Sequence, residues 1–276
     1  MRKTRRPCVH PDFESAVSTA KKAVKEAIDR KQDPDFLPAW TDRSFKGKFV
    51  NAQHGKCGFC EGLVAGNQYG DIEHFRPKAE VHELVDDPDR WGVERRANST
   101  VTNRKTKEPI VKPGYWWLAY SWDNFLLSCL TCNQVWKANL FPVKGPRARA
   151  AGVQENALLL SPFDDFNPSE HFEYGRLGEI IGTSERGRAT IITCGLDRPS
   201  LRLARYKIAV ATHTTLDEVA DDVLDDIVLR GLRDIETNGD PKQIFCGMVR
   251  TIFERRTGLP WKKLQHLIAV LEKSAA

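Results

Sequence analysis

The stretch CLTCNQVWKANLFP, residues 129–142, carries the second of two CxxC pairs in this chain, and the first pair, CGFC, lies at residues 57–60. The two thiolates of a CxxC turn can reach one ion, and a second pair completes a tetrahedral shell of four sulfurs. The two pairs together predict a structural zinc site made by Cys57, Cys60, Cys129 and Cys132. Free or redox-active thiols are the disfavoured alternative, because neither pair lies in the strand-to-helix setting of a thioredoxin-like sheet.

Such a site would join two distant segments. The first, EGLVAGNQYGDIEHFRP at residues 61–77, is expected to form a β-hairpin turned at residues 65–67, and the second, starting at Cys132, a short helix. Because the site does not exist in the unfolded chain, metal binding should contribute directly to folding. Two strands and a helix pinned at one end make a small scaffold with a cleft. The polar residues expected to face this cleft are Glu73, His74, Asn124 and Asn133.

The remaining cysteines and the start of the chain indicate the compartment. Cys8, Cys194 and Cys246 stand apart from the two pairs, and we expect each of them to be a small buried hydrophobic residue. MRKTRRP is not followed by the apolar core of a signal peptide, and no apolar run approaches the roughly 20 residues that span a bilayer. We therefore expect a cytoplasmic protein without a membrane partner.

The length of 276 residues allows one large or two modest domains, and we predict an α+β fold in three regions. Residues 13–30 place apolar side chains at helical spacing and predict an amphipathic helix within an N-terminal segment, residues 1–50. Residues 51–145 would form the cysteine-bearing core, interrupted by a polar insertion at 86–113. Residues 146–276 hold two short strand patterns followed by long helical patterns, so this region is predicted to be mainly helical.

Positive charge gathers in two segments, although the net charge is only +5. Residues 1–50 hold 12 Lys and Arg against 7 Asp and Glu, and residues 101–150 hold 8 against 2. A basic segment beside a candidate site suits a phosphate-rich partner, but many solvated faces carry similar charge. Charge therefore favours a nucleic-acid partner only in combination with other signals.

Two phrases carry a specific resemblance. IEHFRPK at residues 72–78 and the pattern W-x-N-x-L-L-x-C-x-x-C-N-x-x-x-K-x-N-x-F-P at residues 122–142 resemble the HNH, or ββα-metal, nuclease motif. Their form is similar to that of HNH endonucleases found beside ATPases in bacterial Septu and retron-linked anti-phage systems. The resemblance extends to LLLSPFDDFNPSEHFEY and GLDRPSLRLAR, so it covers roughly residues 50–210. The insertion at 86–113 departs from this pattern, which leaves the approach of a substrate open.

The resemblance implies a role for each polar residue of the motif. His74 would be the general base, Glu73 a metal ligand where Asp is usual, and Asn124 the asparagine that braces the loop. Asn133 would be the second metal ligand, in a place where His is common. Oxygen donors suit Mg²⁺ or Mn²⁺ better than zinc, so this site and the four-cysteine site should hold different metals. Contacts to the phosphate backbone could come from three basic residues, Arg76, Lys78 and Lys137.

The chemistry of phosphodiester hydrolysis agrees with these residue types. A water molecule must lose a proton near neutral pH, for which an imidazole with an ordinary pKa of roughly 6.5 is suited. A cation must oppose the charge that grows on the phosphate oxygens. Neighbouring residues of a regular strand point to opposite faces, however, so Glu73 and His74 can share a site only where the strand ends or bulges. Pro77 fits such an ending.

For three of these predictions the sequence leaves a second interpretation open. Asn133 could cap the helix and leave Asn139 or Asp71 to the metal. Lys137 could lie on a solvated helix face. The aromatic stretch YWWLAYSW at residues 115–122 is expected to pack in the core beneath the site, with a base-stacking platform as the alternative.

The sequence thus predicts a zinc-stapled, metal-dependent HNH endonuclease that hydrolyses the phosphodiester bonds of phage or other foreign DNA. The resemblance implies a partner ATPase of the SMC-like or OLD-like kind, and we expect its contact in the helical second half of the chain, which includes the acidic run DEVADDVLDD at residues 217–226. RNA, for instance a transfer RNA, is the alternative substrate, because such a site reads the backbone. A zinc-bearing binding module that lacks catalysis is the alternative of another class.

Overall fold

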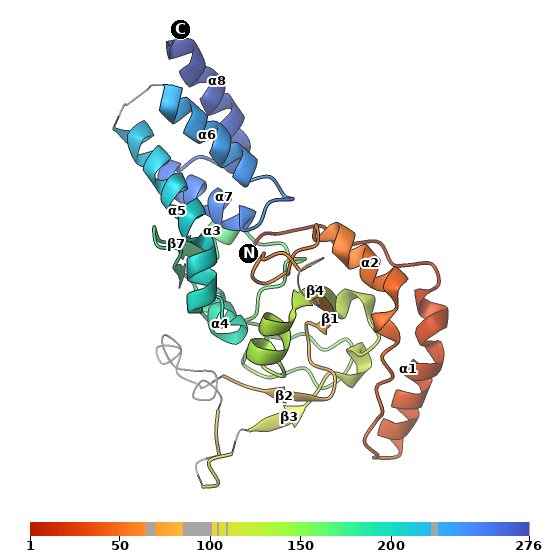
Figure 1. Ribbon diagram of the computed structural model, residues 1–276. Coiled ribbons are helices and arrows are strands. Elements are labelled where there is room, and N and C mark those ends of the chain that lie inside the picture. The colour runs from red at the N-terminus through yellow and green to blue at the C-terminus, as the bar shows by residue number, and fades with distance from the viewer. Residues whose placement is uncertain (65–69, 85–100, 104, 109, 222–225, 276) are drawn as a thin grey trace.

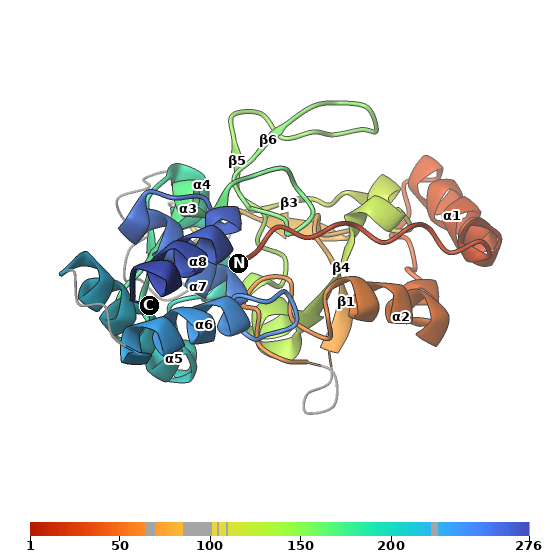
Figure 2. The ribbon, with the colours of Figure 1, turned by 90° about the horizontal axis from the view of Figure 1, so that it is seen from above.

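Figure 1 shows the computed structural model of the chain, which describes residues 1–64, 70–84, 101–103, 105–108, 110–221 and 226–275. The strands next to the cysteine pairs lie near the centre, with two N-terminal helices on one side and a group of C-terminal helices on the other (Figures 1 and 2). Helices combined with two-stranded antiparallel sheets confirm the predicted mixture of helix and sheet. Within the described ranges, no helix has the length and apolarity needed to cross a bilayer.

The central sheet is an antiparallel pair of strands, β1 (Gly70–His74) and β4 (Phe125–Cys129). Gly70 lies opposite Cys129 and His74 lies opposite Phe125. Every residue of β4 is buried, as its nearly continuous apolar run leads one to expect. A short π-helix, η6 (Thr131–Lys137), follows β4 and confirms that a helical segment starts near Cys132.

The predicted hairpin partner of β1 is wrong. We expected β1 to pair with the segment before a turn at residues 65–67, and these turn residues lie outside the described part of the chain. In the structure β1 pairs with β4 instead. Leu63 forms only an isolated bridge to Lys56, and the amide of Cys57 donates to the carbonyl of Gly62 at 2.9 Å. These contacts close the loop around the first cysteine pair, so this segment is used to shape the loop and not to extend a strand.

A second strand pair comes partly from the predicted insertion at 86–113. Residues 86–100, 104 and 109 lie outside the described residues, but the end of the insertion is β3 (Val111–Pro113), paired with β2 (Glu80–His82). A Cβ on Gly114 would lie only 2.6 Å from the carbonyl carbon of Ala79. The glycine therefore lets the end of the insertion approach the segment that follows β1.

The N-terminal helices pack on the central strands through aromatic side chains. Helix α1 (Phe13–Asp29) confirms the predicted helix at 13–30. Helix α2 (Arg43–Ala52) is capped at its N-terminus by Asp42, whose side chain accepts from the amide of Ser44. The ring of Phe13 lies 5.0 Å from that of Trp122. Three single-turn helices complete this region: η1 (Ala39–Thr41), η4 (Trp116–Leu118) and η5 (Trp122–Asn124). Tyr115, Tyr120 and Trp122 are buried, which agrees with the predicted core packing of this stretch.

The C-terminal region has two further strand pairs and is otherwise mainly helical. The strand pairs are β5 (Val143–Lys144) with β6 (Asn156–Ala157), and β7 (Phe172–Tyr174) with β8 (Ile180–Gly182). The helices are α3 (Pro168–His171), α4 (Glu185–Cys194), α5 (Pro199–Ala220), α6 (Asp226–Asn238), α7 (Cys246–Thr257), η7 (Trp261–Lys263) and α8 (Leu264–Ala275). Helices α5 to α8 lie together at one end of the molecule (Figure 1). Four residues of the acidic run at 217–226, namely 222–225, lie outside the described residues.

Buried polar contacts tie the first cysteine turn to this helical region. The Lys56 ammonium donates to the carbonyls of Pro241 and Gln243 at 2.7 and 2.6 Å. The Glu61 carboxylate accepts from the amide of Gly247, the second residue of α7, at 3.1 Å. Because both charged groups are buried and their hydrogen bonds cross to this region, the cysteine turn and the start of α7 are held in one arrangement.

The isolated cysteines differ in burial. Cys194 and Cys246 are buried, as predicted, but Cys8 is exposed, so its predicted burial is wrong. Cys8 lies on the segment before α1, which forms neither helix nor strand and lines an open groove with part of its length.

Candidate functional site

The four cysteines of the two CxxC pairs come together in one buried cluster. Their sulfur atoms all lie within 4.8 Å of one another, and the sulfurs of Cys60 and Cys129 are 3.9 Å apart. Four thiolates at about 2.3 Å from a tetrahedral zinc ion would be separated by ~3.8 Å, so the cluster has the dimensions of a zinc site. The register of β1 and β4 and the turn into η6 place the second pair beside the first. The structure thus brings together the four sulfur ligands that the sequence predicts, and this buried Cys₄ group could bind a metal such as zinc.

Neighbouring donors offset the negative charge that four thiolates would carry. The guanidinium of Arg198 donates to the Cys132 sulfur at 3.5 Å, and the backbone amide of Cys132 donates to the Cys129 sulfur at 3.4 Å. The hydroxyl of Ser128 lies 3.6 Å from the Cys57 sulfur. Outer contacts of this kind orient metal ligands and tune their charge.

Glu73 and His74 line the same cavity of ≈310 Å³, together with Lys78, Asn133 and Asn139. The strand ends at His74, and beyond it the Phe75 amide donates to the carbonyl of Asn124 at 2.8 Å. Because the strand ends here, Glu73 and His74 can face the same cavity although they are adjacent in sequence.

His74 is held in one tautomer by a backbone carbonyl. Its Nε2 lies 2.8 Å from the carbonyl oxygen of Ala119, which can only accept a hydrogen bond, so Nε2 carries the proton and Nδ1 is the acceptor. The ring packs edge-on against Trp40 and Phe125, with ring centroids 4.6 and 5.1 Å away. Burial, together with the positive charge of Lys78, lowers the pKa of His74 to about 3. The imidazole is therefore neutral at physiological pH.

Asn124 connects the loop of Ala119 to the segment after β1. Its Oδ1 accepts from the Arg76 amide at 2.8 Å, and its Nδ2 donates to the carbonyls of Arg76 and Leu118 at 2.9 and 3.2 Å. Leu118 precedes the residue that binds His74, so Asn124 fixes the surroundings of the imidazole without lining the cavity. The prediction that Asn124 faces the cleft is therefore wrong, because its side chain is used to join these two segments.

Glu73 is paired with Lys137. The Lys137 ammonium is fully buried and donates to Glu73 Oε1 at 2.5 Å and to the His74 carbonyl at 3.0 Å. Burial raises the pKa of the Glu73 carboxyl, and the nearby ammonium of Lys137 opposes this rise. Lys137 therefore does not lie on a solvated helix face, and its ammonium neutralises the carboxylate of Glu73.

A double-mutant cycle on this pair has a specific expected outcome. Lys137→Met leaves Glu73 buried without a counter-charge and should lower the free energy of unfolding by about 3–5 kcal/mol. Adding Glu73→Gln should recover most of this loss, because the buried charge is then removed with its partner. Chemical denaturation of the wild type, both single variants and the double variant measures the coupling. Additive effects would contradict the ion pair.

The remaining basic residues of the motif lie in different environments. Lys78 lines the cavity with its ammonium 4.7 Å from the ring centroid of Trp40, and burial lowers its pKa, an effect opposed by Glu73. Arg76 instead donates to the buried Glu155 carboxylate at 2.7 Å and lies over the ring of Phe141. Lys78 is thus the basic side chain placed to meet a ligand in the cavity, whereas Arg76 is engaged in the protein.

The three residues considered as oxygen ligands of the catalytic metal differ in their position relative to the cavity. Asn139 lines the cavity but donates to Glu80 at 2.7 Å. Asp71 accepts from the Ile72 amide and is not among the described residues that line the cavity. Asn133 lines the cavity from the first turn of η6, where its carbonyl accepts from the amide of Ala138.

Sequence reasoning missed two residues that shape the site. Trp40 packs on both His74 and Lys78, and Glu155 holds Arg76 away from the cavity. Neither stands within a recognisable phrase. The only signal for Trp40 is an apolar residue at the end of the proline-broken stretch DPDFLPAW.

The fold and the cysteine cluster define a protein of mixed helix and sheet with a buried Cys₄ group that could hold a metal, and comparisons with known proteins show what it is similar to. No family model matches the chain. Over 193 residues, 68% of its length, the chain is 34% identical to the Septu protein PtuB of Bacillus mycoides (strain KBAB4). Over 99 residues, 34% of its length, it is 35% identical to the Septu protein PtuA of the same organism. The chain spans 58% of the length of PtuB and 14% of that of PtuA. These similarities confirm the resemblance to Septu proteins that the motifs indicate.

Proposed function

We propose that this chain is the nuclease effector of a Septu-type anti-phage system, an HNH endonuclease that hydrolyses phosphodiester bonds. The observation that carries the proposal is the cavity in which His74, oriented by the Ala119 carbonyl, lies beside Glu73, Lys78 and Asn133. The nuclease core would be residues 51–145, with the zinc site as its structural staple. Foreign DNA is the favoured substrate, and RNA is the alternative.

His74 would act as the general base. With the proton on Nε2 donated to Ala119, Nδ1 is the atom left to take a proton from the attacking water. The low pKa keeps this nitrogen unprotonated, and a phosphate anion entering the cavity would raise its proton affinity. Lys78 would contact the phosphate oxygens, and Asn124 would keep the loop of Ala119 in place.

The donor set of the cavity fits a hard divalent cation. Glu73 has a second carboxylate oxygen besides the one that accepts from Lys137, and Asn133 offers an amide oxygen. Mg²⁺ is commonly held by one or two such oxygens together with substrate phosphates, so these two residues would hold Mg²⁺ or Mn²⁺. Bound there, the cation would supply positive charge against the phosphate oxygens and the leaving group.

The similarity to both a PtuB and a PtuA protein supports a two-component system. We propose that a partner ATPase licenses cleavage and that the acidic end of α5, including Asp217 and Glu218, takes part in its contact. Part of this acidic run lies outside the described residues.

The proposal is tested by incubating the purified protein, alone and with its partner ATPase, with plasmid DNA and with total RNA. We expect nicked or linear plasmid in Mg²⁺ or Mn²⁺ and no product in EDTA. Metal-dependent cleavage of RNA alone would transfer the proposal to the alternative substrate. A protein that retains zinc but gives no metal-dependent product with either substrate would instead be a binding module.

A further inference from the structure

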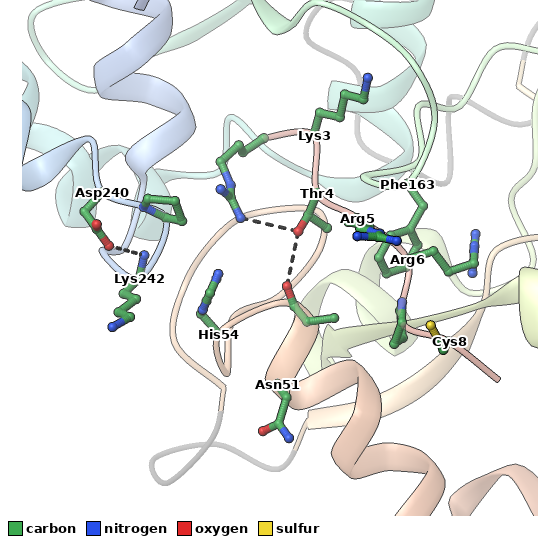
Figure 3. A pocket seen from close by; sticks show the side chains of 14 residues that line it. Lys3, Thr4, Arg5, Arg6, Cys8, Asn51, His54, Phe163, Asp240 and Lys242 are labelled. Atoms are coloured by element: carbon green, nitrogen blue, oxygen red, sulfur yellow. Dashed lines mark hydrogen bonds between the residues drawn. The ribbon is translucent and has the colours of Figure 1, made fainter. Parts of the chain in front are cut away.

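A second, larger opening lies away from the residues of the catalytic cavity. This groove of ≈970 Å³ is lined by four parts of the chain that are distant in sequence: residues 2–8, residues 51–54 at and after the end of α2, Phe163, and the connection between α6 and α7. In Figure 3, His54 lies between Lys242 on one side and the N-terminal segment with Thr4 on the other. The hydroxyl of Thr4 donates to the carbonyl of Ala52 at 3.1 Å and fastens the segment to α2. The groove is thus formed by the folded chain as a whole.

The lining of the groove is strongly basic. Five lysines and arginines line it, namely Arg2, Lys3, Arg5, Arg6 and Lys242, and the acidic side chain among its lining residues is Asp240. Burial and the positive charges of Arg2, Lys56 and Lys242 lower the pKa of His54, which lines the same groove. The positive potential of the groove is therefore not balanced by its own acids.

These five cations divide into fixed and available groups. Arg6 is fixed: it donates to the carbonyls of Trp122 and Phe125 at 3.2 and 3.0 Å and lies over the ring of Phe163. The side chain of Lys3 points away from His54 (Figure 3), and its ammonium is paired with Asp165.

Three cations remain free for a ligand. The side chain of Arg2 donates to the hydroxyl of Thr4 at 3.4 Å, and no described residue accepts from the side chains of Arg5 or Lys242. Among the described residues, none of these three cations is paired with a carboxylate.

The groove is linked to the catalytic cavity through one residue. The carbonyl of Phe125 accepts from Arg6 of the groove wall, and the ring of Phe125 packs against His74. The strand β4 therefore supports both sites, and their relative position is fixed by the same hydrogen-bonded strand pair.

We propose that this groove binds the phosphodiester backbone of the nucleic acid outside the cleavage cavity, an inference that rests on the proposed nuclease function. A nucleic-acid strand carries one charge per roughly 3.4 Å of helix axis, so several phosphates would lie along a groove that Arg2, Arg5 and Lys242 line. Thr4 and Asn51 add the hydroxyl and amide groups that commonly accompany such backbone contacts. Binding there positions the substrate and reads no sequence.

The test uses the full-length, zinc-loaded His74→Ala protein, which holds nucleic acid without cutting it. Fluorescence anisotropy with a labelled DNA duplex and with a labelled RNA measures affinity across a range of salt concentrations. The groove variant Arg2→Glu, Arg5→Glu, Lys242→Glu is compared with a control that reverses three exposed charges on the C-terminal helices, Lys207→Glu, Arg230→Glu and Lys262→Glu. Melting temperature and zinc content verify that each variant is folded, and Arg5→Gln with Lys242→Gln provides a milder second variant.

We expect the groove variant to bind at least about tenfold more weakly than the control. The slope of log affinity against log salt should become shallower by about 2–3, which is the loss of three phosphate contacts. Equal affinities and slopes in the groove and control variants would overturn the proposal. The proposal would also be overturned if the groove variant no longer bound the partner ATPase but still bound nucleic acid as the control does. The groove would then be a binding site for an acidic protein. Absence of binding by the parent protein would also overturn it, whereas cleavage by the wild type decides the proposed nuclease function independently.

Discussion

Replacing Cys132 with serine is expected to remove the bound metal and to destabilise the whole core. The four sulfurs are buried and lie within 4.8 Å of one another, so the loss of one ligand leaves three buried thiols without a tetrahedral site. Structural zinc contributes about 10–16 kcal/mol in small zinc domains, comparable with the total stability of about 5–15 kcal/mol of a typical protein. We expect the melting temperature to fall by about 10–20 °C, or the folded state to be lost. Circular dichroism melting curves and elemental analysis for zinc measure both effects.

The same loss should follow from a strong chelator and should be reversed by added zinc. Cys8→Ser is the matched control, because Cys8 is exposed and stands apart from the cluster. It should keep one zinc ion per chain and the melting temperature of the wild type. A Cys132→Ser protein with full zinc content and an unchanged melting curve would show that the cluster is not a structural metal site.

Replacing His74 is expected to abolish cleavage while leaving the fold in place. A general base contributes about 10²–10⁴ to the rate, so His74→Ala should lower the single-turnover cleavage rate by at least about a hundredfold. His74→Gln is the sharper variant, because its amide can donate to the Ala119 carbonyl as the imidazole does but is too weak a base to take a proton. Both variants should retain zinc.

The control for His74 is a second buried histidine in a similar bond. His213 Nε2 lies 3.0 Å from the carbonyl of Tyr174 in the C-terminal region, far along the chain from the cavity residues. His213→Gln should cleave as the wild type does. Because burial depresses the pKa of His74, the acid limb of kcat/KM that belongs to it should lie well below the usual range of a histidine. If His74→Gln and His213→Gln cleaved at the same single-turnover rate as the wild type, His74 would not be the general base.

Local patterns predicted those parts of the fold that depend on neighbouring residues. The spacing of apolar side chains predicted α1, and the two CxxC phrases predicted the metal cluster, because each phrase already brings two ligands together. The partner of β1 was not predictable in this way. A strand pattern indicates which face is buried but not which distant strand covers its edge, so the nearer segment before β1 was chosen wrongly over β4.

The environment of Lys137 was unpredictable for a related reason. Its partner Glu73 is 64 positions away, and a lysine near the end of a helical pattern is usually solvated. Only the folded pair shows that the ammonium is buried against the acid of the cavity. The prediction for Cys8 was wrong in the opposite direction. Cysteine is small and is usually buried, but the segment that carries Cys8 lies at the surface.

In the proposed nuclease, a zinc ion bound by four cysteines joins two distant segments, and this brings His74 next to a second, harder cation held by Glu73 and Asn133. Anomalous X-ray scattering from a crystal soaked in Mn²⁺ tests this claim most directly, because the zinc and manganese absorption edges distinguish the two ions. We predict zinc bound to Cys57, Cys60, Cys129 and Cys132, and manganese in the cavity beside Glu73 and Asn133. Zinc at other ligands, or manganese that contacts neither Glu73 nor Asn133, would contradict the account.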